Sequence, residues 1–408
     1  MTEGRPAGVA SGHGDLLDAA RAQLDDIVSL RRRLHRRPEL GLDLPETQRV
    51  IVEELAALGL EAERGTRLSS VTAVIGRDRP GRTVVLRADM DALPLTEATG
   101  LEFASQIPGL MHACGHDTHV SMLLGGAKLL VQRAARDAAA LPGPVVLMFQ
   151  PGEEGFFGAR VMLEEGLLEG LDRSATRGFA IHISTQYPSG EIRTRPGALL
   201  ASADNFAITV RGRGGHASAP HFAQDPIVVA AEIVTALQTS VTREVNVFDP
   251  AVVTVAHLTA GTTTNVIPET ARLEGTYRTV SDGRRTAVTQ LIRRVAEGVA
   301  AAHGLTVEVG FEPLYPVTVN DAAVADRVRE IAVDLVGADD VVTMDAPIMG
   351  AEDWSYVLQQ VPGAMAFLGA RPRGADDGYP NNHSNLVVFE EEPMAVGAAL
   401  YAKVALEI

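Results

Sequence analysis

The segment 111–119, MHACGHDTH, concentrates side chains that can do chemistry. It holds the single cysteine of the chain, Cys114, and three of its 11 histidines. Cys114 has no cysteine partner within the chain, and the nearby imidazoles could stabilise its thiolate, the form that binds metals. In an extended loop, side chains two residues apart point the same way, so Cys114 and His116 could bind one ion. The alternative is a buried cysteine at the start of a helix with surface histidines around it.

Two adjacent carboxylates, Glu153 and Glu154, stand in the glycine-rich segment QPGEEG, directly after an expected strand at 144–149. Neighbouring side chains do not share one face, so one carboxylate could bind a metal while the other faces a substrate. A nearby cation would keep the first ionised, and the second would be suited to general-base work on water. For this pair taken alone, the alternative is a solvated acidic turn.

Further acids and imidazoles stand at the ends of other expected strands. Asp89 and Asp91 follow the strand at 83–88, and His182 ends the strand at 178–182. In open parallel sheets, ligands bind in the crevice beyond the carboxyl ends of the strands. We therefore expect these side chains to share one site with the glutamate pair. The alternative is that polar residues simply favour loops.

Four polar residues later in the chain are candidates for contact with a substrate or a metal. His216 stands in the glycine-rich segment GRGGHASAP, where it could polarise a carbonyl oxygen or simply be exposed. Asn265 and Arg278 could hold a carboxylate, since arginine suits bidentate contact, or could have solvent partners. His383 is the only histidine after His303, so any imidazole ligand from the C-terminal segment must be His383.

The pattern of apolar residues predicts an α/β domain around the first candidates. Its helices are expected at 16–34, 46–58 and 119–136, and its buried strands at 71–75, 83–88, 144–149 and 178–182. Near the C-terminus, helices are expected at 322–336, 354–360 and 391–404, and strands at 340–344 and 365–368. Strands that alternate with helices indicate a mostly parallel sheet with helices on both faces.

A different order of elements interrupts this α/β domain. The expected order is a strand at 205–211, a helix at 226–239, strands at 251–259 and 269–279, a helix at 284–302 and a strand at 305–311. This β-α-β-β-α-β order is that of a ferredoxin-like domain. A chain of 408 residues also exceeds what one core usually serves. The predicted domains are therefore a first domain formed by 15–198 and 312–408, and an inserted domain at 199–311.

Composition argues against several classes of function. The formal net charge of −16 argues against nucleic acid as a partner, because phosphate binding needs a basic surface. No apolar run approaches the length of a membrane span, and residues 1–15 lack the apolar core of a signal peptide. We expect a cytoplasmic protein with a short disordered N-terminal tail. The basic run 31–37 could bind a polyanion, but it also ends a helix, where cations suit the helix dipole.

The chain resembles the metal-dependent aminoacylase and carboxypeptidase family, specifically the branch of hippurate hydrolases and auxin-conjugate amidohydrolases. The motifs that carry this resemblance are RRRLHRRPELGLDLPET, LRADMDALPL, MHACGHDTH, FQPGEEG, GRGGHASAPH, NVIPE, GTYRT and MGAEDWSYVLQQVPG. Any one of them would be weak, but eight in order are specific.

The resemblance implies a hydrolase that uses two divalent metal ions to cleave the amide bond of N-acyl amino acids. It implies that Glu153 is the general base, that His216 stabilises the oxyanion and that Asp91 orients the metal site. Asn265 and Arg278 would lie near the substrate. The inserted domain would be a lid and a dimerisation surface, and in some relatives the histidine acts across a dimer interface. The implied metal ligands are Cys114, His116, Glu154, His182 and His383.

Two departures from the family pattern bear on these roles. Asp89 stands where the wider family has a histidine ligand, which fits the branch with a Cys-x-His ligand pair and argues against a ligand role for Asp89. Phe389-Glu390 comes a little later after His383 than the Phe-Asp of branch members, which implies a different local loop.

The metal, the substrate and the reaction class keep alternatives at this point. Thiolate and imidazole suit zinc, manganese is equally expected, and cobalt or nickel can occupy such sites. The acyl group could be acetyl, benzoyl or indole-acyl, with p-aminobenzoyl-glutamate and N-acetyl-diaminopimelate as alternative substrates. One rival is a cysteine hydrolase with Cys114 as nucleophile and His116 as base, which leaves the glutamate pair unused. Another is a non-catalytic binding protein on the same fold, although such a relative would be expected to lose some of these residues.

Overall fold

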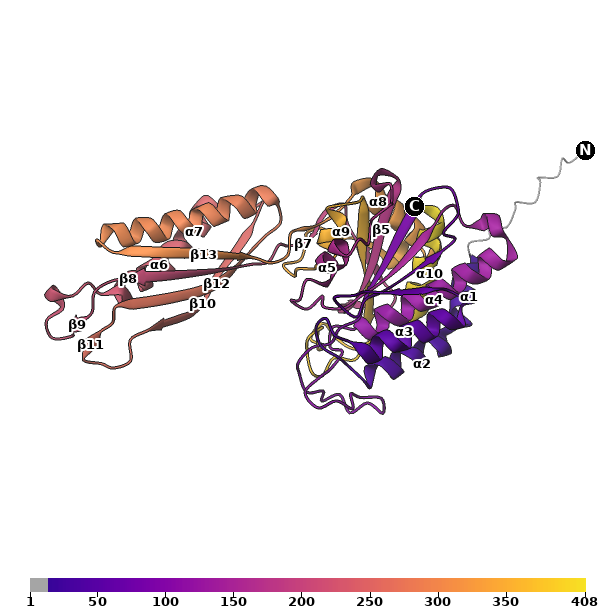
Figure 1. Cartoon of the computed structure of the whole chain (residues 1–408), viewed down its shortest axis with the longest axis horizontal. Helices are drawn as coiled ribbons and strands as arrows, with labels where there is room; N and C mark the ends of the chain where they lie inside the picture. The colour runs from indigo at the N-terminus through magenta and orange to yellow at the C-terminus, as the bar shows by residue number, and fades with distance from the viewer. Residues whose placement is uncertain (1–13) are drawn as a thin grey trace, which may run out of the picture. The chain divides into compact units, whose positions relative to one another are not determined.

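The computed structural model describes residues 14–408, so nearly all of the expected N-terminal tail lies outside the described residues. The described chain forms two compact units (Figure 1). Unit 1 contains the residues up to Gly197 together with Asn320–Asp345 and Val357–Ile408. Unit 2 contains Ala198–Val319 and Ala346–Tyr356.

Unit 2 begins at Ala198 and runs to Val319, whereas the predicted inserted domain spans 199–311, and unit 2 also gains a separate segment. The segment Ala346–Tyr356 groups with unit 2, although the sequence places it in the first domain. Hydrogen bonds explain the grouping, since the Tyr356 hydroxyl donates to the Leu314 carbonyl at 2.6 Å and the Thr318 hydroxyl donates to the Glu352 carbonyl at 3.4 Å. These partners are far apart in sequence, so no local pattern reveals them.

Unit 1 is built on an eight-stranded sheet in the order β1-β2-β4-β3-β5-β16-β6-β15. Its strands are β1 (Ala62–Arg64), β2 (Val71–Ile75), β3 (Thr83–Asp89), β4 (Val145–Gln150), β5 (Thr176–Pro188), β6 (Ile192–Thr194), β15 (Val341–Thr343) and β16 (Gly363–Arg371). The four central strands, β4, β3, β5 and β16, are parallel, whereas β1, β2 and β6 make antiparallel pairs. The predicted mostly parallel sheet is therefore present, with antiparallel additions near its edges.

Both faces of the central strands are buried. On β3, Leu86 and Ala88 join the main hydrophobic core, and Val85 and Arg87, which alternate with them, are also fully buried. A strand buried on both faces needs a continuous apolar sequence, which is why β3 was recognisable as TVVLRAD. Its carboxyl end then delivers Asp89 and the following acid to the edge of the sheet.

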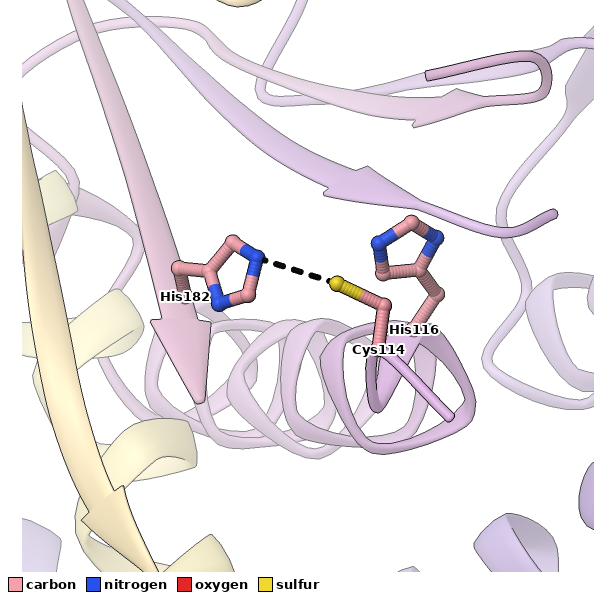
Figure 2. Close-up of side chains that lie close together, drawn as sticks. All are labelled: Cys114, His116 and His182. Carbon is pink, nitrogen blue, oxygen red and sulfur yellow. Dashed lines mark hydrogen bonds between the residues drawn. The ribbon is translucent and has the colours of Figure 1, made fainter. Parts of the chain in front are cut away.

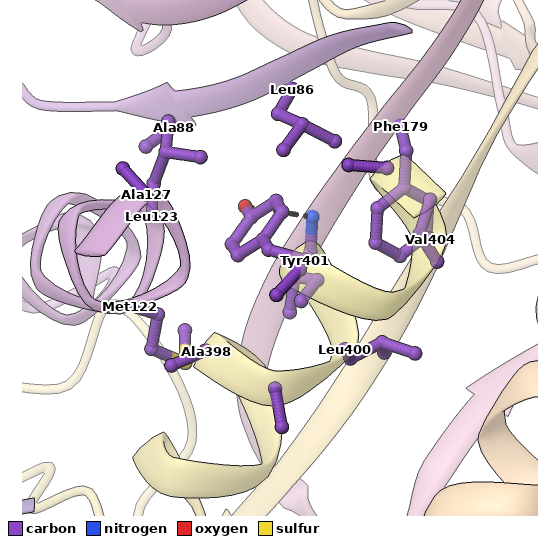
Figure 3. Close-up of a cluster of buried hydrophobic side chains, with 14 of the residues drawn as sticks. Leu86, Ala88, Met122, Leu123, Ala127, Phe179, Ala398, Leu400, Tyr401 and Val404 are labelled. Carbon is purple, nitrogen blue, oxygen red and sulfur yellow. Dashed lines mark hydrogen bonds between the residues drawn. The ribbon is translucent and has the colours of Figure 1, made fainter. Parts of the chain in front are cut away.

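The helices of unit 1 are α1 (Gly14–Arg21), α2 (Leu24–His35), α3 (Pro45–Ala57), α4 (His116–Arg136), α5 (Gly158–Glu164), α8 (Ala322–Val336) and α10 (Met394–Glu407), and the short α9 (Ser355–Leu358) crosses the boundary between the units. Figure 3 shows α10 packed against α4 and against side chains of β3 and β5. The Tyr401 hydroxyl donates to the Arg87 carbonyl at 2.7 Å and accepts the N–H of Ile181 at 3.2 Å, so it ties α10 to both strands. None of the helices described in 14–408 is long and apolar enough to cross a bilayer.

The first predicted helix, 16–34, is wrong in one detail, because the chain turns at Ala22 and Gln23 between α1 and α2. Neither glycine nor proline marks this break, and both helices bury apolar residues in the same core, so the apolar pattern runs across it. The basic run in α2 has internal partners. Arg31 is 1% exposed, and it pairs with Asp117 at 2.7 Å and with Glu391 at 3.0 Å. A polyanion is therefore not needed to explain Arg31.

Unit 2 has a four-stranded antiparallel sheet in the order β10-β12-β8-β13. Its elements are β8 (Asp204–Arg211), β9 (Gly215–His216), α6 (Pro226–Glu244), β10 (Ala251–Ala260), β11 (Val266–Ile267), β12 (Thr270–Thr279), α7 (Asp282–Ala302) and β13 (Thr306–Pro313). The main elements follow the predicted β-α-β-β-α-β order, and the small β9–β11 pair is an addition. Apolar residues of α6 and α7 pack on the sheet in a separate core. The short strands β7 (Gly197–Leu200) and β14 (Thr318–Asn320) pair where the chain enters and leaves this unit.

Candidate metal centre

Five candidate ligands from distant parts of the chain come together in unit 1. Cys114 lies just before α4, and His116 is the first residue of that helix. Glu154 follows β4, His182 lies on β5, and His383 lies in the segment between β16 and α10. The structure thus gathers all the side chains that the resemblance implies as ligands.

Cys114 lies at the centre of this cluster. Its Sγ is 3.4 Å from Nε2 of His182 and 3.3 Å from Nε2 of His383. Figure 2 shows His182 and Cys114 pointing toward each other, with His116 beside them. The donor atoms of Cys114, His116 and His182 lie within 4.8 Å of one another, as do those of Cys114, Glu154 and His383. These two groups share only the thiol, so together they offer donor atoms for more than one ion.

Gly115 determines how Cys114 and His116 reach the same place. The expected extended loop is wrong, because Gly115 adopts a φ of 90° and caps α4, which begins at His116. A Cβ at Gly115 would lie 2.5 Å from Ile183 and 3.1 Å from Phe389. Only glycine combines this backbone with so close an approach. Phe389, whose position after His383 departs from the family pattern, is thus a buried ring against Gly115.

His383 is held in a left-handed backbone conformation with a φ of 71°, which is costly for a residue other than glycine. Its N–H donates to the Ala113 carbonyl at 2.9 Å. The neighbouring Asn382 donates from Nδ2 to the carbonyls of Cys114 and Ile183, both at 3.0 Å. The surrounding hydrogen bonds therefore fix this imidazole beside the thiol, and Asn382 is a positioning residue that sequence reasoning missed.

Asp91 connects the glutamate pair with His116. Its Oδ1 and Oδ2 accept the backbone N–H groups of Glu153 and Glu154, each at 3.0 Å, and Nδ1 of His116 lies 3.4 Å from Oδ1. Donor atoms of His116, Glu153 and Glu154 lie within 4.8 Å of one another. Asp91 is 1% exposed and Glu153 is 6% exposed, so this arrangement is shielded from solvent. The geometry suits the orienting role implied for Asp91.

A second group of buried charges lies next to His116. Nη1 of Arg87 is 2.6 Å from Oδ2 of Asp89, and Nδ1 of His119 is 2.5 Å from Oδ1. Nε2 of His119 accepts the N–H of Ile183 at 2.8 Å, so Nδ1 carries the proton and donates to Asp89. Asp89 is thus engaged by other side chains of the protein, although its donor atoms lie within 4.8 Å of those of His116 and His119. Sequence reasoning missed His119, although its spacing from His116 on one helix was a usable signal.

Burial and charge set the protonation states in the cluster. Burial lowers the pKa of His182 well below its ordinary value, so the ring is neutral, which is the form that binds metals. Burial acts to raise the pKa of Glu154, but the hydrogen bond from His383 and the charge of His116 outweigh it and lower that pKa overall. Hydrogen bonds with Cys114 and Glu154 raise the pKa of His383 to about 10. The cluster thus pairs the ionised Glu154 with a protonated His383, whereas His182 is neutral.

The donor set fits divalent metal ions. Within 14–408, neither ring nitrogen of the buried His116 has a hydrogen-bond partner. Buried polar atoms without such partners are costly unless an ion or a water satisfies them. Sulfur, imidazole and carboxylate donors are those that zinc prefers, and imidazole and carboxylate also suit manganese.

The three candidates of unit 2 fall into two places. His216 lies on β9, and the Asn265 carbonyl accepts the N–H of Ala217 at 3.1 Å, so His216 and Asn265 are neighbours. Both lie beside the end of β12 that starts at Thr270, because β11 pairs with β9 just before it. Arg278 lies eight residues further along this extended strand, a distance of about 26 Å. One chain cannot bring His216 and Arg278 to the same small substrate.

The comparison with protein families matches this site. A profile of the Peptidase family M20/M25/M40 matches residues 85–407, a stretch that contains all five candidate ligands and Glu153. The chain belongs to this family. The resemblance that the motifs indicate is therefore confirmed, and the match includes unit 2 of this M20 protein.

Relatives of known name match the M20 protein over nearly its whole length. Thermostable carboxypeptidase 2 of Saccharolobus solfataricus is 41% identical over 389 residues, which cover 94% of this chain and 95% of the relative. IAA-amino acid hydrolase ILR1-like 2 of Arabidopsis thaliana is 40% identical over 391 residues, which cover 94% of this chain and 85% of the relative. The solved structure of the Bacillus subtilis YXEP protein, described as a dinuclear metal-binding peptidase from the M20 family, is similar with a TM-score of 0.81. It is 34% identical, with 95% of this chain and 98% of that chain covered.

Proposed function

We propose that this M20 protein is an amidohydrolase that cleaves N-acyl amino acids with two divalent metal ions. The observation that carries the proposal is the convergence of five ligand candidates on Cys114, with the glutamate pair held beside them by Asp91. The relatives support the reaction class, since one is named as an IAA-amino acid hydrolase and one structure is described as a dinuclear metal-binding peptidase.

Cys114, His116, Glu154, His182 and His383 would hold the ions in this proposal. When bound, such ions polarise an amide carbonyl and make water more acidic. Glu153 takes the proton of the attacking water and returns it to the leaving nitrogen. Asp91 fixes the backbone of Glu153, and the Glu153 side chain is almost fully buried. Its carboxylate is therefore held in position during the proton transfer. Thiol and imidazole donors favour zinc, with manganese next and cobalt or nickel as further candidates.

We also propose that unit 2 is a lid and a dimerisation domain, and that His216 serves the site of a second copy. The support is the separation of about 26 Å between the two ends of β12. Arg278 stands at the end where the chain enters and leaves unit 2, with its Nη1 donating to the Met349 carbonyl at 3.0 Å. His216 and Asn265 stand at the other end and are exposed. If the residues at both ends of β12 serve catalysis, Arg278 and His216 of one chain act on two different substrate molecules. In a homodimer, each site would then receive Arg278 from one chain and His216 from the other.

A screen of N-acyl amino acids with the protein loaded with zinc, manganese, cobalt or nickel tests the reaction. Acetyl, benzoyl and indole-acyl conjugates are the first substrates, and p-aminobenzoyl-glutamate and N-acetyl-diaminopimelate are the alternatives. The expected result is release of a free amino acid that stops when a chelator removes the metal. Failure to hydrolyse any of these amides while the ions are bound would contradict the proposal.

A further inference from the structure

The Ser218 side chain lies against the ring of His216. Oγ of Ser218 is 2.7 Å from Nδ1 of His216, and the backbone N–H of Ser218 donates to the same nitrogen at 3.1 Å. A backbone N–H can only donate, so Nδ1 is an acceptor and carries no proton. In the neutral imidazole the proton then lies on Nε2.

We propose that Ser218 is a positioning residue that fixes His216 as an Nε2–H donor. This inference rests on the proposed function and on the oxyanion-stabilising role that the family resemblance implies for His216. Such stabilisation needs a donor that is already in place, since a ring that exchanges tautomers presents an acceptor part of the time. Both residues are exposed, so packing does not hold the ring and the hydrogen bonds from Ser218 must do so.

The backbone around this pair is held independently of the serine hydroxyl. The Ala219 N–H donates to the His216 carbonyl at 2.9 Å, and the Ala217 N–H donates to the Asn265 carbonyl at 3.1 Å. A Ser218→Ala variant therefore keeps the turn and the backbone contact to Nδ1, and it loses only the hydroxyl donor. Ser218→Thr keeps the hydroxyl and is the matched control.

Side-chain nitrogen NMR of histidine-labelled protein reads the tautomer directly, with His216→Ala identifying the signal. In the wild-type protein we expect an unprotonated Nδ1 and a protonated Nε2. In Ser218→Ala only the 3.1 Å backbone contact to Nδ1 remains, so we expect the Nε2-protonated tautomer to lose population to the Nδ1-protonated one, and in Ser218→Thr we expect the wild-type pattern. An Nδ1-protonated ring in the wild type, or an unchanged tautomer in Ser218→Ala, overturns the inference.

Kinetics with the metal-loaded dimer or monomer, as it is isolated, give the second readout. Ser218→Ala should lower kcat by about 3- to 10-fold, the value of one neutral hydrogen bond, with KM and metal content unchanged and kcat rescued in Ser218→Thr. A changed KM with an unchanged kcat in Ser218→Ala, or an equal loss of kcat in Ser218→Ala and Ser218→Thr, would overturn the positioning role of the Ser218 hydroxyl. Normal turnover by His216→Ala would instead overturn the role of His216, whatever the NMR shows.

Discussion

The carboxylate of Asp91 accepts the backbone N–H of Glu153 at 3.0 Å, which joins the end of β3 to the turn after β4. The side chain proposed as general base therefore stands on a backbone that another acid holds. Because the second oxygen of Asp91 holds the N–H of Glu154 in the same way, one residue sets the position of both the base and a ligand.

The Glu153→Gln variant should retain its metal and lose about 10²- to 10⁴-fold in kcat, because an amide cannot take a proton from water. Metal content by elemental analysis and kcat on the best amide substrate check this. Glu61→Gln, at an exposed position, is the control. Near-normal turnover by Glu153→Gln would remove this residue from the proposed role.

Replacement of Asp91 by asparagine should weaken metal binding by about 10- to 100-fold, the usual cost of losing a group that orients ligands. An asparagine can present only one carbonyl oxygen, so it cannot accept both N–H groups that the carboxylate now accepts. Titration of the ion-free protein with zinc measures the change. Wild-type affinity in Asp91→Asn would show that the backbone keeps its place without this carboxylate.

A chelator should abolish activity, and added manganese or zinc should restore it. Cys114→Ala should lose metal together with activity, because Cys114 is the residue shared by the donor group with His116 and His182 and the donor group with Glu154 and His383. The cysteine-hydrolase alternative gives the opposite result, with activity that survives chelation and an acyl group trapped on the sulfur. Mass spectrometry of the protein during turnover detects such an adduct.

Two inactive variants should restore each other if His216 acts on the site of a second copy. A mixed dimer of Glu153→Gln and His216→Ala contains one site with both intact residues. Co-expression of the two variants should recover up to half of the wild-type activity per mixed dimer. No recovery in mixed dimers that purify as such would place His216 and Glu153 in the same chain's site.

The stability of the loop around Glu97 should depend on pH. Burial acts to raise the pKa of Glu97, but hydrogen bonds from His35, Ser105 and Thr99 outweigh it and lower this pKa to about 2. The unfolded value is near 4.3. A carboxyl with a lowered folded pKa stabilises the protein fully above the unfolded value and loses this effect as the pH falls toward 2.

Glu97→Gln should therefore lower the free energy of unfolding at pH 7 by about 1 kcal/mol, the usual net value of one hydrogen bond. The difference from the wild type should narrow at pH 3. Urea unfolding at the two pH values measures it. A difference that stays constant or grows at low pH would contradict the assigned hydrogen bonds.

The sequence identified the residues of the candidate site but did not predict the local backbone geometry that positions them. Glu154 was recognisable because it stands in a family motif, His182 because it ends an expected strand, and His383 because it is the only histidine after His303. The structure brings each of them close to Cys114. The left-handed Gly115 was not predicted, because its conformation depends on the approach of Ile183 and Phe389 from other parts of the chain.

The elements missed by sequence reasoning depend on contacts between distant segments. His119 gains its role only because α4 packs so that Asp89 and the N–H of Ile183 meet its two nitrogens. The break between α1 and α2 leaves no trace in the sequence, since the apolar pattern continues through Gln23. Strands such as β3 were predictable because a strand that is buried on both faces has a nearly continuous run of apolar residues.

The chain enters and leaves unit 2 through adjacent segments. The Ala203 N–H donates to the Tyr315 carbonyl at 2.9 Å, and the Tyr315 N–H donates back to the Ala203 carbonyl at 3.1 Å. A short turn could therefore replace everything between these two residues without stretching either neighbour. The five ligand candidates would all remain in such a miniature, since none of them belongs to the excised part.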